Sequence, residues 1–217
     1  LLPQEAKILI SIGLLVVVGA IALIVMKPAM TVSEQPIDTS IIIRENSHTL
    51  GAVGAKVQVV EFGDYQCPAC AYAHPIFTKL MKDYANNPNV SFTFRNFPLP
   101  GHKNAIVSAQ AAEAASAQGK FWEMHDMLYE KQDEWSELSN PKELFATYAT
   151  AVGLDVTKFS TDVSKNAYSA IINADKNDGE DLNINGTPSF FINGEKFGVG
   201  NVPSYEEFKA KIDEELK

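Results

Sequence analysis

A Cys-x-x-Cys pair constrains this sequence more than any other feature. Cys67 and Cys70 are the only cysteines of the chain, and they lie between an apolar run at residues 57–62 and a helical pattern at residues 71–84. A strand, a short loop and a helix are therefore expected in that order, with the pair at the start of the helix. Pro68 suits the first helical position, where its missing backbone N–H has no cost.

This placement predicts different chemistry for the two sulfurs. The first turn of a helix has unpaired N–H groups and partial positive charge, which stabilise a thiolate. The pKa of Cys67 should therefore be low, and we expect its sulfur to be the exposed nucleophile. Cys70, one turn further into the helix, is expected to be the more buried resolving cysteine. The pattern is typical of a redox-active pair.

Two other uses of the pair are open at this point. A structural zinc site needs about four ligands, and the four histidines, His48, His74, His102 and His125, are scattered along the sequence. A purely structural disulfide between Cys67 and Cys70 would close too short a loop to stabilise a fold of this size much. We therefore expect a redox role, with neither a metal nor a cofactor.

Two segments of the chain resemble the DsbA-like branch of the thioredoxin superfamily. They are residues 59–70, Val-Val-Glu-Phe-Gly-Asp-Tyr-Gln-Cys-Pro-Ala-Cys, and residues 186–194, Gly-Thr-Pro-Ser-Phe-Phe-Ile-Asn-Gly. The resemblance extends from about residue 47 to the C-terminus. It implies a thiol–disulfide oxidoreductase with an α/β thioredoxin fold and an inserted all-helical block, similar to membrane-anchored or secreted bacterial members.

The resemblance also implies roles for residues outside the pair. In the family, an acidic residue at the position of Glu61 lies buried beneath the disulfide and helps proton transfer at the resolving cysteine. Burial would raise the pKa of this carboxyl group; an exposed strand carboxylate is the alternative. Thr187 and Pro188 match the cis-proline loop, which would contact an incoming substrate peptide. The alternative is an ordinary trans proline at the start of a strand.

Pro68 and Ala69, between the cysteines, are expected to tune the redox potential. A side chain that donates a hydrogen bond to the Cys67 thiolate would stabilise the reduced form and make the protein more oxidising. Many oxidases of the family have a histidine at the second of these positions. Ala69 departs from that pattern, so only the helix dipole and backbone N–H groups are expected to stabilise the thiolate.

The N-terminal region predicts a membrane anchor. Residues 8–26 carry no charge and lie between Lys7 and Lys27, which is long enough for a membrane-spanning helix. We favour an uncleaved anchor over a cleaved signal peptide, because the apolar run is long and no Ala-x-Ala site follows it. The expected organisation is an anchor segment at 1–27, a linker at 28–39 and a DsbA-like thioredoxin domain at 40–217.

The rest of the pattern fits strands on both sides of a helical block. Strands are expected at residues 40–44, 57–62, 90–94, 188–192 and 196–199, and a final helix at 204–216. Asn193-Gly194 between two apolar runs is a hairpin signal. Residues from about 104 to 182 contain only helical patterns. A separate helical domain is the alternative, but no long flexible linkers flank this block.

Charge and compartment limit the partners. The formal net charge of −9 and the lack of a basic cluster argue against nucleic acid. An oxidising cysteine pair is useful outside the cytosol, so we expect the domain on the extracytoplasmic side of the cell membrane. The family implies reduced, unfolded proteins as substrates and a quinone-coupled membrane partner as the reoxidase. A reductase or isomerase, or a non-catalytic peptide-binding or chaperone module, are the competing interpretations.

Overall fold

Strands from the two ends of the domain meet in one central sheet. The computed structural model describes residues 41–217, and within them five strands follow the order β1-β3-β2-β4-β5. β2 (Val57–Gly63) pairs in parallel with β3 (Val90–Asn96) and antiparallel with β4 (Ser189–Ile192). β1 (His48–Gly51) and β5 (Glu195–Val199) form the edges.

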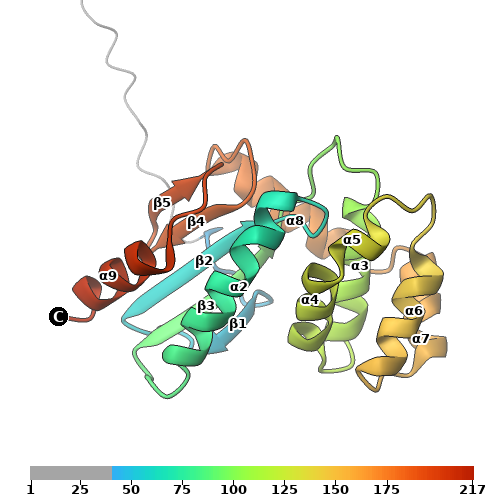
Figure 1. Ribbon diagram of the computed structural model, residues 1–217, viewed down its shortest axis with the longest axis horizontal. Coiled ribbons are helices and arrows are strands. Elements are labelled where there is room, and N and C mark those ends of the chain that lie inside the picture. Colours follow the sequence, from blue (N-terminus) through green and yellow to red (C-terminus); the bar gives the residue numbers. More distant parts are fainter. Residues whose placement is uncertain (1–40) are drawn as a thin grey trace, which may run out of the picture. The chain divides into compact units, whose positions relative to one another are not determined.

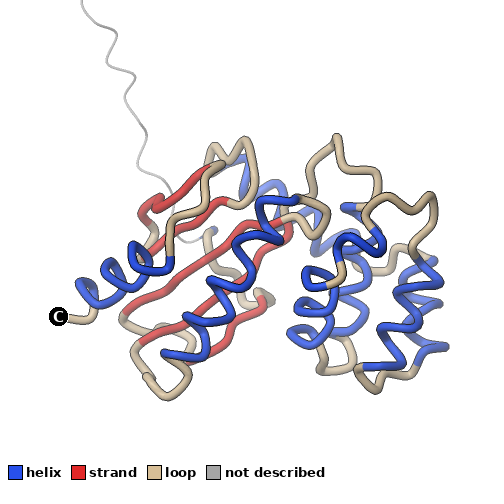
Figure 2. The backbone as a smooth tube through the Cα atoms, in the orientation of Figure 1, coloured by secondary structure: helices blue, strands red, loops and turns tan. Residues whose placement is uncertain are grey.

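The helix that begins at the cysteine pair crosses over between the two parallel strands. α2 (Pro68–Asp83) connects β2 to β3, as a parallel pair requires. α2 and α9 (Tyr205–Glu215) cover the same face of the sheet (Figures 1 and 2). Between them lies a cluster of aromatic rings, in which the centroid of Phe190 is 5.1 Å from Phe77 and 5.0 Å from Phe208.

The chain between β3 and β4 is helical wherever it is regular. Figure 1 shows α3 to α7 gathered into one block. α8 instead packs on the sheet face opposite α2. Its Gly179 lies so close to the Phe97 ring that an added Cβ atom would be 2.5 Å from that ring. The structure thus confirms a thioredoxin-like α/β fold with a helical insertion. The six helices are α3 (Ala105–Ser116), α4 (Phe121–Glu130), α5 (Gln132–Trp135), α6 (Lys142–Ala151), α7 (Val156–Ser164) and α8 (Ser169–Asp181).

The prediction of a strand at residues 40–44 is wrong. The structure describes residues 41–44 of this range, and they do not form a strand. The edge strand beside β3 is β1, and Ile42 is buried against the sheet instead of pairing in it. The carbonyl oxygens of Ile41 and Ile42 accept hydrogen bonds from Nη1 of Arg95, at 2.9 and 2.8 Å. A buried guanidinium therefore takes the place of a neighbouring strand for this backbone.

Arg95 also joins β3 to α8. Its Nε donates to Asp175 at 2.6 Å and its Nη2 donates to Asp178 at 2.5 Å, with all three side chains buried. The Arg44 guanidinium also donates to Asp178, at 2.6 and 2.9 Å. A buried charge needs this degree of pairing, so the network fixes α8 on its face of the sheet.

The predicted membrane helix at residues 8–26 and the linker at 28–39 lie outside the described residues. Within residues 41–217, none of the helices is both long enough and apolar enough to cross a membrane.

Candidate functional site

The two cysteines lie at the N-terminus of α2, as expected. Cys67 is the N-cap, with extended backbone angles, and Pro68 occupies the first helical position. Both thiols are free. The expectation of an exposed Cys67 is wrong, because its residue is only 6% exposed, compared with 0% for Cys70. The loop of Thr187 and the inserted helices cover the sulfur, although Cys67 remains the more accessible of the two.

The surroundings shift the pKa values of the two thiols in opposite directions. The pKa of Cys67 falls to about 5, mainly because the Cys70 thiol donates a hydrogen bond to it. Thr187 and the backbone N–H groups of Cys70 and Ala69 lower it further, against the effect of burial. Burial raises the pKa of Cys70 well above its usual value, and the hydrogen bond to Cys67 adds to this. Cys67 is thus a thiolate and Cys70 a thiol at neutral pH.

The loop before β4 lies against the Cys67 sulfur. The Thr187–Pro188 peptide bond is cis, as the resemblance implied. The Sγ atom of Cys67 lies 3.4 Å from the carbonyl oxygen of Thr187. This loop reaches the pair because β4 lies antiparallel to β2, with Phe190 opposite Glu61. Thr187 and Pro188 are both buried.

Glu61 lies on β2 and is 3% exposed. Burial, followed by the negative charge of Cys67, raises its pKa to about 8. Its Oε1 atom is buried without a hydrogen-bond partner. The position therefore provides a carboxyl group that is protonated at neutral pH and close enough to Cys67 to sense its charge.

The two residues between the cysteines offer no polar side chain. Pro68 is exposed and Ala69 is half-buried. Ala69 acts on Cys67 through its backbone N–H alone. This is the arrangement that the sequence predicted for a chain without a histidine at position 69.

Asp64 and Gln66 hold the loop before Cys67, and sequence reasoning assigned them no role. Asp64 is buried and accepts hydrogen bonds from the backbone N–H groups of Gln66 and Leu99, at 2.8 and 2.9 Å. Its Oδ2 atom also lies 2.7 Å from Nδ1 of His102. Gln66 accepts from the Asn104 N–H at 2.6 Å. The only signal for these contacts was their place inside the Cys-x-x-Cys segment.

A layer of buried histidine and tyrosine rings lies beside the pair, between α2 and α4. The Tyr65 hydroxyl lies 3.1 Å from Nδ1 of His125. The ring centroids of His74, His125 and Tyr129 are 5.0 to 5.4 Å from one another. Burial lowers the pKa of His74 to about 4 and that of His125 well below its usual value. Both imidazoles are therefore neutral at pH 7.

Two histidines that are distant in the sequence thus become neighbours. His74, His125 and Asp126 each place one ligand atom within 4.8 Å of the others, and this is the one such group among residues 41–217. A structural zinc site takes four ligands, and this group has three. The group is therefore one ligand short of a structural zinc site.

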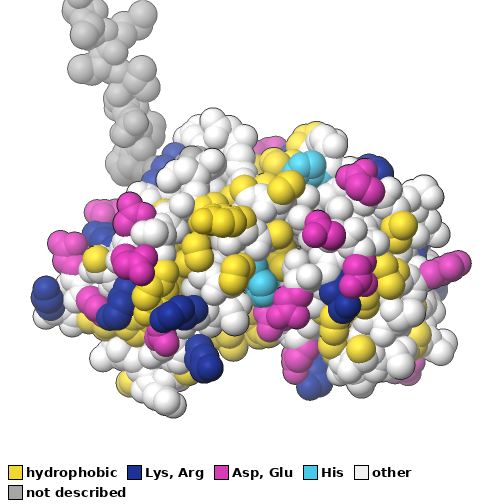
Figure 3. All heavy atoms as spheres, viewed as in Figure 1, with side chains coloured by type: hydrophobic (Ala, Val, Ile, Leu, Met, Phe, Trp, Pro, Cys, Tyr) yellow, Lys and Arg dark blue, Asp and Glu magenta, His cyan; other side chains and the backbone are white. Residues whose placement is uncertain are grey.

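The face around α2 is largely hydrophobic. Figure 3 shows hydrophobic side chains gathered over α2, between charged groups over α9 and over the inserted helices. Tyr72, in the first turns of α2, is 68% exposed. Such a surface next to the cysteine pair suits apolar segments of another chain.

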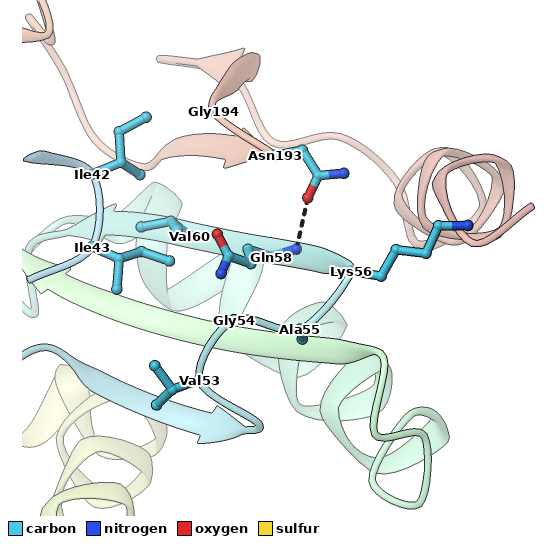
Figure 4. Close-up of a pocket in the computed structure, with 10 residues that line it drawn as sticks. All are labelled: Ile42, Ile43, Val53, Gly54, Ala55, Lys56, Gln58, Val60, Asn193 and Gly194. Carbon is cyan, nitrogen blue, oxygen red and sulfur yellow. Dashed lines mark hydrogen bonds between the residues drawn. The ribbon is translucent and has the colours of Figure 1, made fainter. Parts of the chain in front are cut away.

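A second hollow lies away from the cysteines, on the sheet face opposite α2 (Figure 4). Its volume is about 460 Å³, and the Gln58 N–H donates to Oδ1 of Asn193 at its edge, at 2.9 Å. Lys56 is the one charged residue among those that line it. It therefore lacks groups for the chemistry described above.

Comparison with known proteins gives a consistent family. Residues 44–214 match the thioredoxin family. The probable disulfide bond formation protein D of Bacillus cereus is 30% identical over 215 residues, which covers 97% of this chain and 95% of that protein. The crystal structure of oxidised BdbD from Bacillus subtilis superimposes with a TM-score of 0.70 at 29% identity, covering 78% of this chain and 92% of that chain.

Other relatives are much longer than this chain. The Na(+)/H(+) antiporter NhaA 1 of Salinispora arenicola is 39% identical over 168 residues, which is 76% of this chain but 24% of the antiporter. The chain thus spans about a quarter of the length of these relatives.

Proposed function

The chain belongs to the DsbA-like branch of the thioredoxin superfamily, and from this premise we propose that it is a thiol–disulfide oxidoreductase that acts through Cys67 and Cys70. The observation that carries the proposal is the opposite shift of the two thiol pKa values, to about 5 for Cys67 and well above 9.0 for Cys70. A thiolate next to a protonated resolving thiol is the reduced product that an oxidising disulfide leaves behind.

We infer that the pair works as an oxidase. A substrate thiolate attacks the Cys67 sulfur, the Cys67–Cys70 bond breaks, and Cys70 leaves as a thiolate that takes a proton from Glu61. A second substrate thiolate then attacks the substrate sulfur of the mixed disulfide. Cys67 leaves as a stabilised thiolate, so two electrons pass from the substrate to the protein and the substrate gains a disulfide.

The low pKa of Cys67 favours this direction. A stabilised thiolate makes the reduced form more stable, which makes the disulfide a stronger oxidant. Ala69 adds no side-chain donor that would stabilise the thiolate further, so the side chain at this position does not favour the oxidase direction. A reductase or isomerase of the same fold is therefore the second candidate, and the reduction potential separates the two.

Unfolded, reduced proteins are the proposed substrates. Pro188 lacks an N–H, and the backbone of Thr187 lies next to Cys67. This loop would pair with an extended peptide, while the exposed Tyr72 and Pro68 would contact its apolar side chains. The disulfide-formation name of the Bacillus cereus relative supports this substrate class.

We further propose an extracytoplasmic domain held to the cell membrane by a single helix at residues 8–26. Residues 28–39 would form the linker to it. An oxidase needs to be reoxidised after each cycle, so a quinone-coupled membrane protein is the proposed electron acceptor. Disulfides persist on this side of the membrane, which is where donation of a disulfide is useful.

The reduction potential of the Cys67–Cys70 pair tests the proposal. It is measured on the full chain by equilibration with glutathione, with Cys67→Ser as the control that cannot cycle. A potential near −120 mV, roughly that of strong oxidases, supports disulfide donation, whereas a value near −270 mV, roughly that of thioredoxin, supports a reductase. A pair that never equilibrates with glutathione is a structural bridge, and the enzymatic proposal is then wrong.

A further inference from the structure

Buried polar atoms without a hydrogen-bond partner gather on one side of the cysteine pair. Among residues 41–217 there are six such side-chain atoms, and four of them are Glu61 Oε1, Tyr129 Oη, His74 Nδ1 and Asp126 Oδ1. Buried polar atoms are nearly always paired in folded proteins. Glu61 lies on β2, and the other three belong to residues of α2 and α4.

At the buried end, near the cysteine pair, the side-chain oxygens of Glu61 and Tyr129 both lie close to Gly63. A Cβ atom on Gly63 would lie 3.0 Å from Glu61 Oε1 and 2.9 Å from Tyr129 Oη. A cavity of about 10 Å³ lies beside Glu61, and its other lining residues are His125, Thr93 and four aromatic side chains. This is roughly the space that one water molecule needs.

In the middle, Tyr129 contacts both histidine rings. Its ring centroid is 5.3 Å from His74 and 5.0 Å from His125. Both imidazoles are neutral because they are buried. A neutral imidazole has one donor and one acceptor nitrogen, so it can accept a proton on one side while it gives one up on the other.

At the outer end, the same residues reach the surface. An open pocket of about 580 Å³ is lined by His74 and Tyr129, together with Ala71, Pro75 and Glu130. His74 Nε2 lies 3.6 Å from Oδ1 of Asp126, whose side chain is 43% exposed. Tyr129 and His74 thus lie between the buried carboxyl group of Glu61 and an opening to solvent.

We propose that Tyr129 and His74 form a proton relay that connects Glu61 with this pocket, with His125 and Asp126 as its supporting residues. The inference rests on the proposed function, in which Glu61 gives a proton to Cys70 as the disulfide is reduced. The relay supplies Glu61 with a proton in the same step, so that no buried carboxylate forms. Tyr129 donates its hydroxyl proton to Glu61 and receives one from the His74 side, so that no net charge stays buried. Water bridges the steps, since the polar atoms do not hydrogen bond directly.

A relay changes rates and leaves the equilibrium alone, which separates it from a structural role. The test measures the rate at which dithiothreitol reduces the disulfide of the full chain, together with the reduction potential. Tyr129→Phe and His74→Ala should each slow the reduction at least about tenfold, since general acid–base steps contribute roughly 10²–10⁴-fold. The reduction potential should stay unchanged in both variants.

Chemical rescue provides the readout that lost packing would not give. Because His74 lines an open pocket, free imidazole in the buffer should restore the reduction rate of His74→Ala but not that of Tyr129→Phe. Tyr205→Phe, which removes a hydroxyl on α9, is the matched control and should react at the wild-type rate. His74→Gln replaces His74→Ala if the alanine variant does not fold.

Two results would overturn the relay. One is wild-type reduction rates in both Tyr129→Phe and the His74 variant. The other is slower reduction that imidazole does not restore and that comes with a shifted potential, which indicates a structural role. If the pair does not exchange disulfides at all, the proposed function is wrong; if it exchanges them at rates that do not depend on Tyr129 and His74, only the relay is wrong.

Discussion

Nε2 of Gln132 donates a hydrogen bond of 3.0 Å to the backbone carbonyl oxygen of Cys67. The same nitrogen donates to the carbonyl oxygen of Tyr65 at 2.7 Å. Gln132 begins α5, so a four-residue helix of the inserted block holds the backbone of Cys67. The insertion thus holds the loop of the cysteine pair in place as well as covering it.

Gln132→Leu should destabilise the protein, because it leaves the buried carbonyl oxygen of Tyr65 without its donor and leaves that of Cys67 with the Ala71 N–H alone. We expect the free energy of unfolding to fall by about 1–3 kcal/mol, measured by urea denaturation of the oxidised protein. Gln118→Leu, which removes hydrogen bonds at an exposed turn, is the control and should cost less than about 1 kcal/mol. Equal losses in the two variants would contradict the clamping role of Gln132.

Removing the Cys70 thiol should raise the pKa of Cys67. The hydrogen bond from Cys70 is the largest cause of the low value of about 5, so Cys70→Ala should move it upward toward the usual 9.0. Cys70→Ser keeps a donor and should shift it less. The ultraviolet absorbance of the thiolate, followed across pH, measures both values. Identical titrations in the two variants would mean that the helix N-terminus alone sets the pKa.

Glu61→Gln should change how stability depends on pH. Burial raises the Glu61 pKa from 4.5 to about 8, so the folded protein holds a proton in this window that the unfolded chain releases. The contribution of protonated Glu61 to the free energy of unfolding is complete below pH 4.5 and is lost as pH rises toward 8. In the oxidised protein, where Cys67 carries no charge, burial remains as the cause. Urea denaturation should therefore show Glu61→Gln gaining stability over wild type as pH rises.

The control for that comparison is Glu137→Gln, since Glu137 is exposed and pairs with Lys103 at the surface. Its stability should follow the wild-type curve across the same pH range. Parallel curves for Glu61→Gln and wild type would show that Glu61 ionises normally in the folded protein.

Gly63→Ala should destabilise the end of β2. The added Cβ atom would lie 2.5 Å from the Phe94 ring and about 3 Å from the oxygens of Glu61 and Tyr129, in a fully packed site. Overpacking of this kind costs typically about 1–3 kcal/mol. Gly101→Ala, where nothing lies within 4 Å, is the matched control and should be close to neutral. Thermal or urea unfolding of the two variants measures the difference.

Features that depend on neighbouring residues were predictable from the sequence. Pro68 at the first helical position marked the start of α2, and Asn193-Gly194 formed the tight turn between β4 and β5 with positive φ angles of 50° and 84°. The block of helices between the strands, and the burial of Glu61 on β2, followed from pattern and family resemblance.

Features that depend on distant residues were not predictable. Ile42 looked like part of a strand because it is apolar. In the structure, the carbonyl oxygens of Ile41 and Ile42 accept hydrogen bonds from the Arg95 guanidinium instead of from a neighbouring strand. His74 and His125 looked scattered, yet α2 and α4 pack so that their rings lie 5.4 Å apart. The burial of Cys67 also has this origin, since its cover comes from Thr187 and from the inserted helices.

The pairing of β2 with β4 also has a consequence for how the protein is made. Val59 on β2 pairs with Ile192 on β4, which is far later in the chain. The cysteine pair therefore leaves the ribosome long before β4 and the Thr187–Pro188 loop, which complete its surroundings. During that interval the two thiols lack the cover that the finished fold gives them. The newly made chain is therefore most open to unwanted thiol chemistry while its helical block is being synthesised, and the last strands to emerge end that exposure.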